Sequence, residues 1–323
     1  MSSPAFETPT QLLRIAAKDE IARDIFRFEL VRADGGDLPE FTAGAHVSLR
    51  TPNGLIRKYS LCNNPEERDR YAIAVKREDP GTGGSLSFTR DAKVGDEVEV
   101  GEPRNDFPLA NNIPNHLFIA GGIGITPIYS MMQHLKSTGA GRFKLYYLTR
   151  TPELTAFREE LKASAYAGQV VIHHDHGDPE KSLDLWPILE KPQGRHLYCC
   201  GPRPLMEAVR DMSGHWSSAA VHFEDFGASK PAHKPDDKPF TVRLAKSGRS
   251  VEIPAEVSIL DALRAEGVAV SSSCESGTCG SCRTKLLEGE AEHRDLVLTE
   301  REQASNIMIC VSRAKSGELV LDL

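Results

Sequence analysis

Four cysteines near the end of the chain have the spacing of an iron–sulfur ligand set. Cys274, Cys279 and Cys282 follow a C-x4-C-x2-C pattern, and 27 residues then separate Cys282 from Cys310. Four thiolates can hold two irons bridged by two sulfides, and this spacing is typical of plant-type [2Fe–2S] sites. Glycines inside the loop suit a tight turn that directs backbone N–H groups toward the sulfurs. A structural zinc site is the alternative, although such sites usually use paired C-x2-C motifs.

A second motif, Arg57-Lys58-Tyr59-Ser60, has the side chains needed to bind a flat, phosphorylated ligand. The aromatic ring can stack on a planar ring system, the hydroxyl can bond a ring nitrogen, and the arginine can bind a phosphate. Gly83-Gly84-Ser85 follows, and glycines with a hydroxyl before a helix predict a phosphate-binding turn. An ordinary barrel surface and an ordinary glycine-rich loop remain the alternatives.

A third motif runs from Gly121 to Pro127 with the sequence GGIGITP. It departs from the G-x-G-x-x-G dinucleotide fingerprint, but it places glycines where a strand leads into a helix. Cys200-Gly201-Pro202 repeats this arrangement at a later strand end. Ligands of open α/β sheets bind at such carboxyl ends, so both motifs predict a nucleotide site. Two tight strand-to-helix turns without a ligand are the alternative.

The cluster His173-His174-Asp175-His176, with Asp178, raises the possibility of a metal. A strand end that opens into a loop points successive side chains in different directions, which disfavours a metal here. Asp175 is instead predicted to accept hydrogen bonds from a ribose diol and to disfavour a 2′-phosphate, which favours NADH over NADPH. The cysteines at 62, 199 and 200 are predicted to be buried packing residues, although Cys200 could also reach a cofactor.

The first third of the chain predicts a small antiparallel β-barrel. Apolar and polar residues alternate over four short segments that are separated by turn-forming residues: Phe26–Leu30, Ala45–Leu49, Tyr71–Val75 and Glu97–Val100. Alternation with a period of two is typical of strands with one buried face. Strands that close on themselves leave no exposed edge.

From about Asn111 onward the pattern predicts alternating strands and helices, and therefore a parallel sheet. The expected strands are 116–120, 143–148, 170–173, 196–199 and 221–224. The expected helices are one from Pro127 to Gly139 and others at 152–163, 183–190 and 202–212.

A polar segment, Gly227–Lys238, then predicts an exposed linker. Beyond it, Phe240–Leu244 and Val251–Ile253 alternate as strands. Ser258 is predicted to cap a helix over 259–266 that Gly267 ends.

The composition excludes several classes of protein. The chain has 323 residues, a formal net charge of −7 and 40% hydrophobic residues. This balance indicates packed domains and argues against a membrane span, a secreted disulfide scaffold and a basic nucleic-acid binder. The first residues show neither a basic nor an apolar leader segment, so a cytoplasmic location is expected. A reducing compartment also favours cysteines as ligands rather than as disulfides.

Taken in order, these motifs resemble the ferredoxin–NADP reductase superfamily fused to a plant-type ferredoxin, in particular the subfamily that serves phthalate-type dioxygenases. The resemblance covers nearly the whole chain and implies a multidomain fold. It implies an antiparallel β-barrel FMN-binding domain at residues 1–111 and an α/β parallel-sheet NADH-binding domain at 112–228. A linker at 229–238 and an α+β, β-grasp-like [2Fe–2S] ferredoxin domain at 239–323 would follow.

The resemblance also implies the site residues. The flavin contacts would be Arg57, Lys58, Tyr59, Ser60, Ala74, Val75, Lys76, Thr82, Gly83, Gly84 and Ser85, with Thr126 near the ring and Phe226 covering it. The NADH contacts would be Gly121, Gly122, Ile123, Gly124, Thr149, Arg150, Asp175, Cys200, Gly201 and Pro202. Ser60, Thr126 and Cys200 would be the catalytic residues, and Cys274, Cys279, Cys282 and Cys310 the cluster ligands. The subfamily implies FMN, although the R-x-Y-S motif also serves FAD.

The cofactors together predict an electron-transfer enzyme. NADH gives up two electrons at once as hydride, whereas a plant-type cluster accepts one electron at a time, at ~−400 mV. A flavin can do both, so it is expected to stand between them. The implied partner is a Rieske-type oxygenase of an aromatic substrate, served by a monomeric reductase. A non-catalytic ferredoxin-like carrier is the competing hypothesis, and it leaves residues 1–228 unexplained.

Overall fold

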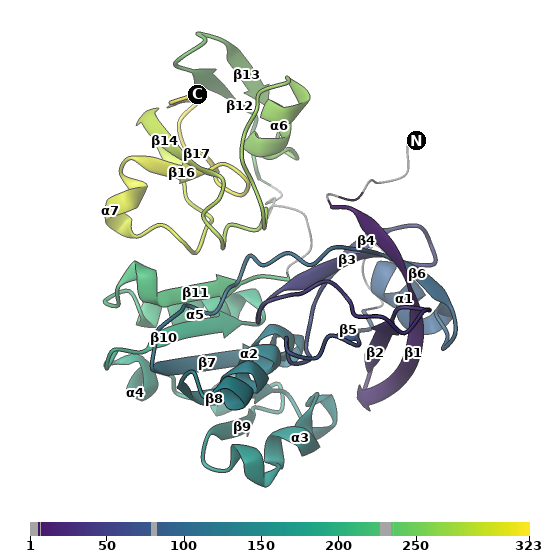
Figure 1. Cartoon of the computed structure of the whole chain (residues 1–323). Coiled ribbons are helices and arrows are strands. Elements are labelled where there is room, and N and C mark those ends of the chain that lie inside the picture. Colours follow the sequence, from purple (N-terminus) through teal and green to yellow (C-terminus); the bar gives the residue numbers. More distant parts are fainter. Residues whose placement is uncertain (1–5, 7, 79–82, 227–233, 235) are drawn as a thin grey trace. The chain divides into compact units, whose positions relative to one another are not determined.

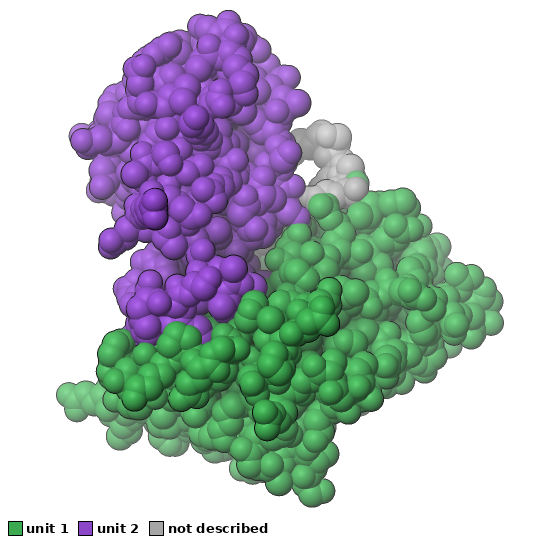
Figure 2. Space-filling model, turned by 60° about the vertical axis from the view of Figure 1, so that its left-hand side comes forward, with its two compact units in different colours: residues 1–202 green, residues 203–323 purple. Residues whose placement is uncertain are grey.

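The computed structural model describes residues 6, 8–78, 83–226, 234 and 236–323. It divides into two compact units, residues 1–202 and 203–323, coloured separately in Figure 2. Within the described ranges, no helix combines the length and the apolar character that crossing a membrane requires.

An antiparallel sheet opens the first unit (Figure 1). Its six strands lie in the order β4-β3-β6-β1-β2-β5. Their bounds are β1 (Thr10–Ala22), β2 (Ile25–Val31), β3 (His46–Arg50), β4 (Ile56–Ser60), β5 (Tyr71–Lys76) and β6 (Glu97–Gly101). An isolated antiparallel bridge between Leu61 and Ile73 joins the chain after β4 to β5, so the two edges of the sheet meet. The predicted antiparallel barrel is therefore confirmed.

The longest strand, β1, was not predicted. Its first half buries Leu13 and Ile15 inside the barrel, but its second half carries the charged run Lys18-Asp19-Glu20. This charged run interrupts the alternation of apolar and polar residues that marks the other strands. Backbone pairing to both β2 and β6 keeps the segment extended nonetheless.

The barrel core reaches the helix that follows it, α1 (Gly84–Asp91). Phe88 of this helix is fully buried and lies 4.5 Å from Phe28, measured between ring centroids. It also stacks on Tyr59, with the ring centroids 6.2 Å apart. Packing of Phe88 thus fixes the helix beside the strand that carries the Arg57–Ser60 motif.

A parallel sheet forms the rest of the first unit, as predicted. Strands β10-β7-β8-β9 are neighbours in that order and all pair in parallel. Their bounds are β7 (Asn115–Gly121), β8 (Arg142–Thr149), β9 (Val170–His174) and β10 (His196–Cys200). Helix α2 (Ile125–Thr138) packs on this sheet (Figure 1) and ends at Gly139, whose φ is 66°.

Two predicted helices of this region are shorter than expected. The segment 152–163 forms a 3-10 turn, η2 (Pro152–Leu154), and a short helix, α3 (Arg158–Lys162). Between them the buried Phe157 adopts φ 56° and stacks on Tyr129 at 4.5 Å. Tertiary packing of this ring outweighs local helix propensity. The segment 183–190 contains only α4 (Trp186–Leu189).

The second unit begins with α5 (Arg203–Met212) and β11 (Val221–Glu224). A mixed sheet follows in the order β13-β12-β18-β14-β16, with α6 (Ile259–Ala265) packed on β13. Ser258 caps α6 by accepting a hydrogen bond from the Asp261 backbone N–H, as predicted. The remaining strands are β12 (Phe240–Leu244), β13 (Ser250–Ile253), β14 (Arg283–Glu288), β15 (Ala291–Glu292), β16 (Asn306–Met308), β17 (Arg313–Ala314) and β18 (Glu318–Leu321).

Short helical turns complete the described chain. They are η1 (Gly122–Gly124), η3 (Ser164–Tyr166), η4 (Pro179–Lys181), η5 (Ser218–Ala220) and α7 (Glu300–Gln303). Of the predicted linker, only residues 234 and 236–238 lie within the described part of the chain.

Candidate functional site

Arg57 and the N-terminus of α1 lie against each other. A Cβ placed on Gly84 would come within 2.7 Å of the Arg57 Nε, so a larger residue there would displace the Arg57 side chain. Gly83, with φ 82°, turns the chain into the helix, and its carbonyl accepts a hydrogen bond from the Asn53 side chain at 3.2 Å. A guanidinium beside a helix N-terminus is an arrangement that can bind a phosphate.

Tyr59 carries a polar atom that the described residues leave unsatisfied. Its hydroxyl is buried and has no hydrogen-bond partner among them. Burial also raises the pKa of Tyr59 to about 12, so the hydroxyl keeps its proton. Because a buried hydroxyl without a partner costs free energy, this atom fits a bound cofactor that accepts its hydrogen bond.

The rest of the predicted flavin set is divided between buried and exposed positions. Ser60, Ala74 and Val75 are buried in the barrel wall, whereas Lys58 and Lys76 are exposed. Ser85 accepts a hydrogen bond from the Glu78 backbone N–H at 3.3 Å. Thr82 lies outside the described residues.

The glycine motif of the parallel sheet meets the Cys200-Gly201-Pro202 turn. A Cβ on Gly124 would lie 2.2 Å from the Cys200 carbonyl oxygen, so the turn after β7 touches the end of β10 at this glycine. The Gly122 carbonyl accepts a hydrogen bond from the buried Tyr147 hydroxyl at 3.0 Å. Gly122 itself has φ 54° and open space where a side chain would be. The paired turns leave backbone exposed at the carboxyl end of the sheet, which suits a dinucleotide.

The other predicted NADH residues gather at the ends of β8 and β9. The Thr149 hydroxyl contacts His174 Nδ1 and the Thr155 hydroxyl, each at 2.8 Å. The Asp175 backbone N–H donates to the Thr149 carbonyl at 3.3 Å, and the Asp175 side chain accepts from the Gly177 N–H at 2.8 Å. Backbone hydrogen bonds thus place Asp175 beside Thr149 and Arg150. The hydrogen bond from the Gly177 N–H orients the Asp175 carboxylate.

The predicted catalytic residues Ser60, Thr126 and Cys200 are all buried, with exposed fractions of 4%, 2% and 0%. The Thr126 hydroxyl donates to the Ile123 carbonyl at 3.0 Å. The cysteines at 62 and 199 are buried too, as predicted. Phe226 belongs to the second unit and is 41% exposed.

The described side chains of the histidine-rich segment His173–His176 do not form a metal-binding site. His173 Nε2 contacts the Lys181 carbonyl at 2.7 Å. No group of three or more His, Cys, Asp or Glu side chains with the geometry of a single-ion site is found in the ranges that the structure covers.

The four predicted cluster ligands form two thiol pairs in the second unit. Cys282 and Cys310 are buried, with their sulfurs 3.1 Å apart. Cys274 and Cys279 are half-buried, and the Cys274 backbone N–H donates to the Cys279 sulfur at 3.4 Å. In each pair the neighbouring thiol lowers the pKa of one member, Cys274 or Cys282, and raises the pKa of the other. Two pairs suit two irons, each held by two thiolates.

The loop that holds these thiols depends on Gly277. Its φ is 77°, and a Cβ there would lie 2.7 Å from a methyl group of Val311 and 3.2 Å from the Asp295 Cα. Backbone N–H groups of Cys274 and Ser276 point at thiol sulfurs, at 3.4 and 3.5 Å. Such donors favour the thiolate state that a cluster requires. The residues present therefore fit a [2Fe–2S] cluster.

Comparisons with known proteins agree with this geometry. Residues 118–211 match the family model of the oxidoreductase NAD-binding domain, and residues 242–315 match that of the 2Fe-2S iron-sulfur cluster binding domain. The phthalate 4,5-dioxygenase oxygenase reductase subunit of Pseudomonas putida is 56% identical over 312 residues, 96% of each chain. Phthalate dioxygenase reductase of Burkholderia cepacia is likewise 56% identical, over 96% of this chain and 97% of that protein. The chain belongs to the phthalate dioxygenase reductase family.

A solved structure supports this membership. It is described as phthalate dioxygenase reductase, a modular structure for electron transfer from pyridine nucleotides to [2Fe–2S]. It matches with a TM-score of 0.70 at 56% identity, covering 97% of this chain and 98% of that one. The expected three-part fold, with a flavin-binding antiparallel sheet, a parallel NAD-binding sheet and a C-terminal iron–sulfur domain, is confirmed.

Family membership also confirms the expected kind of activity. The chain is an oxidoreductase that transfers electrons from a pyridine nucleotide toward an oxygenase. The expected cofactor set of FMN, NADH and a [2Fe–2S] cluster agrees with this membership. The zinc and carrier-module alternatives do not account for the two matched domains together.

Several residues in and around this site were not found from the sequence. Ser130 and Gln133 of α2 donate hydrogen bonds to the carbonyls of Asn63 and Cys62. Neither residue belongs to a motif. The one sequence signal for a structural role is their position on the helix that follows the glycine turn.

Proposed function

We propose that this chain is the NADH-dependent reductase of a Rieske-type aromatic-ring dioxygenase, and that it holds FMN and one [2Fe–2S] cluster. The observation that carries the proposal is the arrangement of four cysteines as two pairs, Cys274 with Cys279 and Cys282 with Cys310, in a chain that also has an NAD-binding domain. Bound flavin would supply the conversion of a hydride into single electrons, which neither NADH nor the cluster can perform alone.

The first task of the chain is to hold the flavin. Arg57 and the N-terminus of α1 provide one anion site, which suits the single phosphate of FMN. The Tyr59 hydroxyl donates to the cofactor, because burial keeps it protonated. Ser60 hydrogen-bonds the flavin ring, and Ala74, Val75 and Ser85 complete the flavin contacts of the first unit.

The second task is to orient the nicotinamide nucleotide. The turns at Gly122 and Gly124 approach the pyrophosphate, and the buried Thr126 and Cys200 line the nicotinamide end. Asp175 receives the ribose diol and repels a 2′-phosphate, so NADH is preferred to NADPH. The Gly177 N–H holds the Asp175 carboxylate in one orientation for this purpose.

The third task is to deliver single electrons. Cys274 with Cys279 would hold one iron, and Cys282 with Cys310 the other. The half-buried first pair lies nearer to the surface than the buried second pair, so it faces the electron acceptor. The reductase acts as a monomer in the cytoplasm, where reducing conditions keep the thiols available as ligands.

Anaerobic purification followed by acid extraction and mass analysis tests the cofactor assignment. We expect one FMN, two irons and two sulfides per chain, together with reduction of cytochrome c by NADH but not at a comparable rate by NADPH. Recovery of FAD in place of FMN would correct the assignment of the flavin. Protein that is colourless and inert toward NADH would refute the function.

A further inference from the structure

Arg203, the first residue of α5, joins three segments of the second unit. Its guanidinium contacts Glu207 one turn along the helix at 3.0 Å and Asp225 after β11 at 3.4 Å. Its Nη2 also donates to the main-chain carbonyl of Arg294 at 2.5 Å. Asp225 is the residue directly before Phe226.

Arg210 makes a second bond of the same kind. It lies seven residues after Arg203, which is about two helical turns and therefore the same face of α5. Its Nη1 donates to the carbonyl of Asp295 at 3.1 Å, while its Nε and Nη2 contact the Asp211 carboxylate. Two guanidinium groups on one helix face thus bind two consecutive carbonyls, those of residues 294 and 295.

The segment that receives these bonds, Glu292–Leu298, is here called the bridging segment. It is attached to the cluster loop, because the Leu296 N–H donates to the Gly277 carbonyl at 2.9 Å. The buried Asp295 carboxylate accepts from the N–H groups of Val297 and Leu298, at 3.1 and 2.8 Å. Gly277 lies between Cys274 and Cys279, so the bridging segment reaches directly to a thiol pair.

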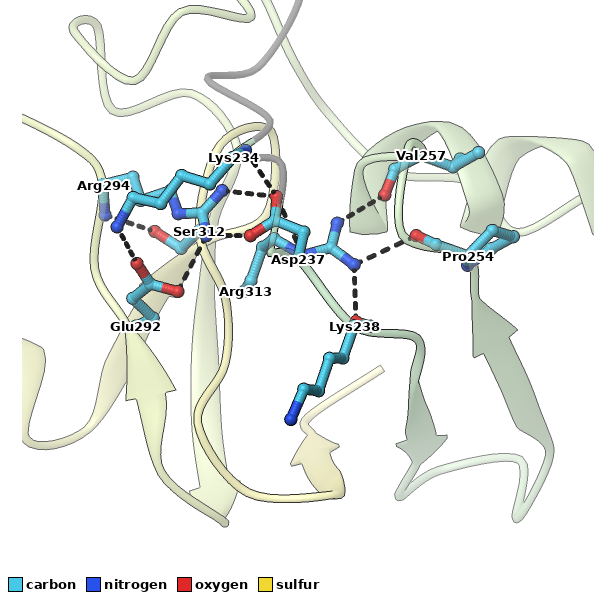
Figure 3. Close-up of polar contacts among 9 residues, drawn as sticks. All are labelled: Lys234, Asp237, Lys238, Pro254, Val257, Glu292, Arg294, Ser312 and Arg313. Atoms are coloured by element: carbon cyan, nitrogen blue, oxygen red, sulfur yellow. Dashed lines mark hydrogen bonds and ion pairs between the residues drawn. The ribbon is translucent and has the colours of Figure 1, made fainter.

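A buried ion network fixes the other end of the bridging segment (Figure 3). The Arg294 side chain contacts Asp237 at 2.5 and 2.9 Å and Glu292 at 2.8 Å, and both Arg294 and Asp237 are nearly buried. Arg313 lies 3.6 Å from Asp237. Arg313 also donates to the carbonyls of Lys238, Pro254 and Val257. Contacts to Asp237 and Gly277 therefore hold the bridging segment at both of its ends.

We infer that Arg203 and Arg210 are positioning residues that dock the cluster loop on helix α5 for electron transfer from the flavin. This inference rests on the proposed function. Helix α5 follows Cys200-Gly201-Pro202 directly in the chain. Both arginine side chains keep a third or more of their surface exposed, and both acceptors are main-chain carbonyls. Bonds of this kind stabilise a docked state without making it permanent.

The test compares the holoprotein with the double variant Arg203→Gln/Arg210→Gln. Stopped-flow absorbance separates flavin reduction by NADH from the later reduction of the cluster. We expect unchanged flavin reduction and at least about tenfold slower cluster reduction, because two charge-assisted hydrogen bonds are lost. Hydrogen exchange should accelerate at Leu296–Leu298, whereas the EPR spectrum of the chemically reduced cluster should not change.

Two further variants sharpen the result. Arg203→Lys retains a cationic donor at this position. Its rate of cluster reduction should therefore lie between the rates of the wild type and the double variant. Arg249→Gln removes an exposed arginine that pairs with Glu266 in the same unit, and it should behave as wild type. Cluster reduction at the wild-type rate in the double variant would overturn the inference, and so would an altered cluster spectrum, which would show a structural role instead. Wild-type protein that never passes electrons from NADH to its cluster would refute the proposed function itself.

Discussion

The buried Ser130 hydroxyl on α2 donates a hydrogen bond of 2.8 Å to the carbonyl of Asn63, three residues after the Arg57–Ser60 motif. Gln133, one turn further along α2, binds the Cys62 carbonyl at 2.7 Å. Helix α2 begins at the glycine turn of the nucleotide site. The proposed flavin strand and the proposed NADH turn are therefore linked through one helix, and the same core includes Ala72, Ala74 and Ile125.

Replacing Ser130 tests this link. Ser130→Ala leaves the Asn63 carbonyl buried without its donor, so we expect a loss of about 1–3 kcal/mol in the free energy of unfolding. Ser137→Ala is the matched control, because Ser137 lies exposed on the same helix and only bonds the carbonyl of His134. Denaturant titration of both variants measures the difference. Equal stability of the two variants would contradict the structural link.

Gly124→Ala tests the contact between the two nucleotide-site turns. The new Cβ would lie 2.2 Å from the Cys200 carbonyl oxygen, so the turns must separate. We expect the KM for NADH to rise about tenfold or more, since about 1.4 kcal/mol of lost binding has that effect. Gly317→Ala, at a site with open space around the added carbon, serves as the control. Steady-state kinetics with an acceptor that takes electrons directly from the flavin isolates this step. An unchanged KM would remove Gly124 from the nucleotide site.

Tyr59→Phe tests whether the unsatisfied hydroxyl serves the cofactor. The substitution removes a buried polar atom that has no partner within the described chain, so apoprotein stability should not fall. Flavin affinity should fall about fivefold, because a hydrogen bond is worth on the order of 1 kcal/mol. Fluorescence titration of apoprotein with FMN measures the affinity. Lower apoprotein stability with unchanged affinity would show that Tyr59 has a purely structural role.

Cys279→Ser tests the order of electron flow. Losing one thiolate of the half-buried pair should abolish cytochrome c reduction and leave flavin reduction by NADH intact. Cys199→Ala changes a buried cysteine outside the thiol pairs and should retain both activities. If the Cys279→Ser protein still reduces cytochrome c at the wild-type rate, electrons do not pass through the cluster.

Asp237→Asn tests the ion network with a pH signature. Hydrogen bonds from Arg294 hold the pKa of Asp237 well below its usual range. A lowered pKa in the folded state means that the carboxylate stabilises the protein above the unfolded value of about 3.9 and loses that effect as the pH falls further. The variant should be about 3 kcal/mol less stable at pH 7, because a buried pair is broken. The difference in unfolding free energy between the variant and the wild type should become smaller below about pH 4, as parallel unfolding titrations would show. A difference that is independent of pH would contradict the ionic role of Asp237.

The sequence predicted the elements whose pattern is local. Alternating residues such as Phe28 and Leu30 marked barrel strands, and Gly139 marked the end of α2. The break at Phe157 could not be predicted, because it depends on packing against Tyr129. Strand β1 was missed because its second half is highly charged although backbone pairing holds it in the sheet.

In the candidate site, too, features with a local sequence pattern could be predicted and features that depend on tertiary contacts could not. The cysteine spacing predicts a ligand set, because a short loop has to carry three of its members, and the structure brings these cysteines together in two pairs. The bonds from Arg203 and Arg210 could not be predicted, since their acceptors are main-chain carbonyls about 85–91 residues away along the chain, and carbonyls leave no mark in a sequence.

EPR spectroscopy after anaerobic mixing with NADH tests directly whether one polypeptide carries electrons from NADH to its own iron–sulfur cluster. We expect the flavin to be reduced first and the signal of a reduced [2Fe–2S] cluster to develop next in the same molecule, whereas the Cys279→Ser variant should show no such signal. A flavin that NADH reduces fully while the intact cluster stays oxidised would contradict this expectation.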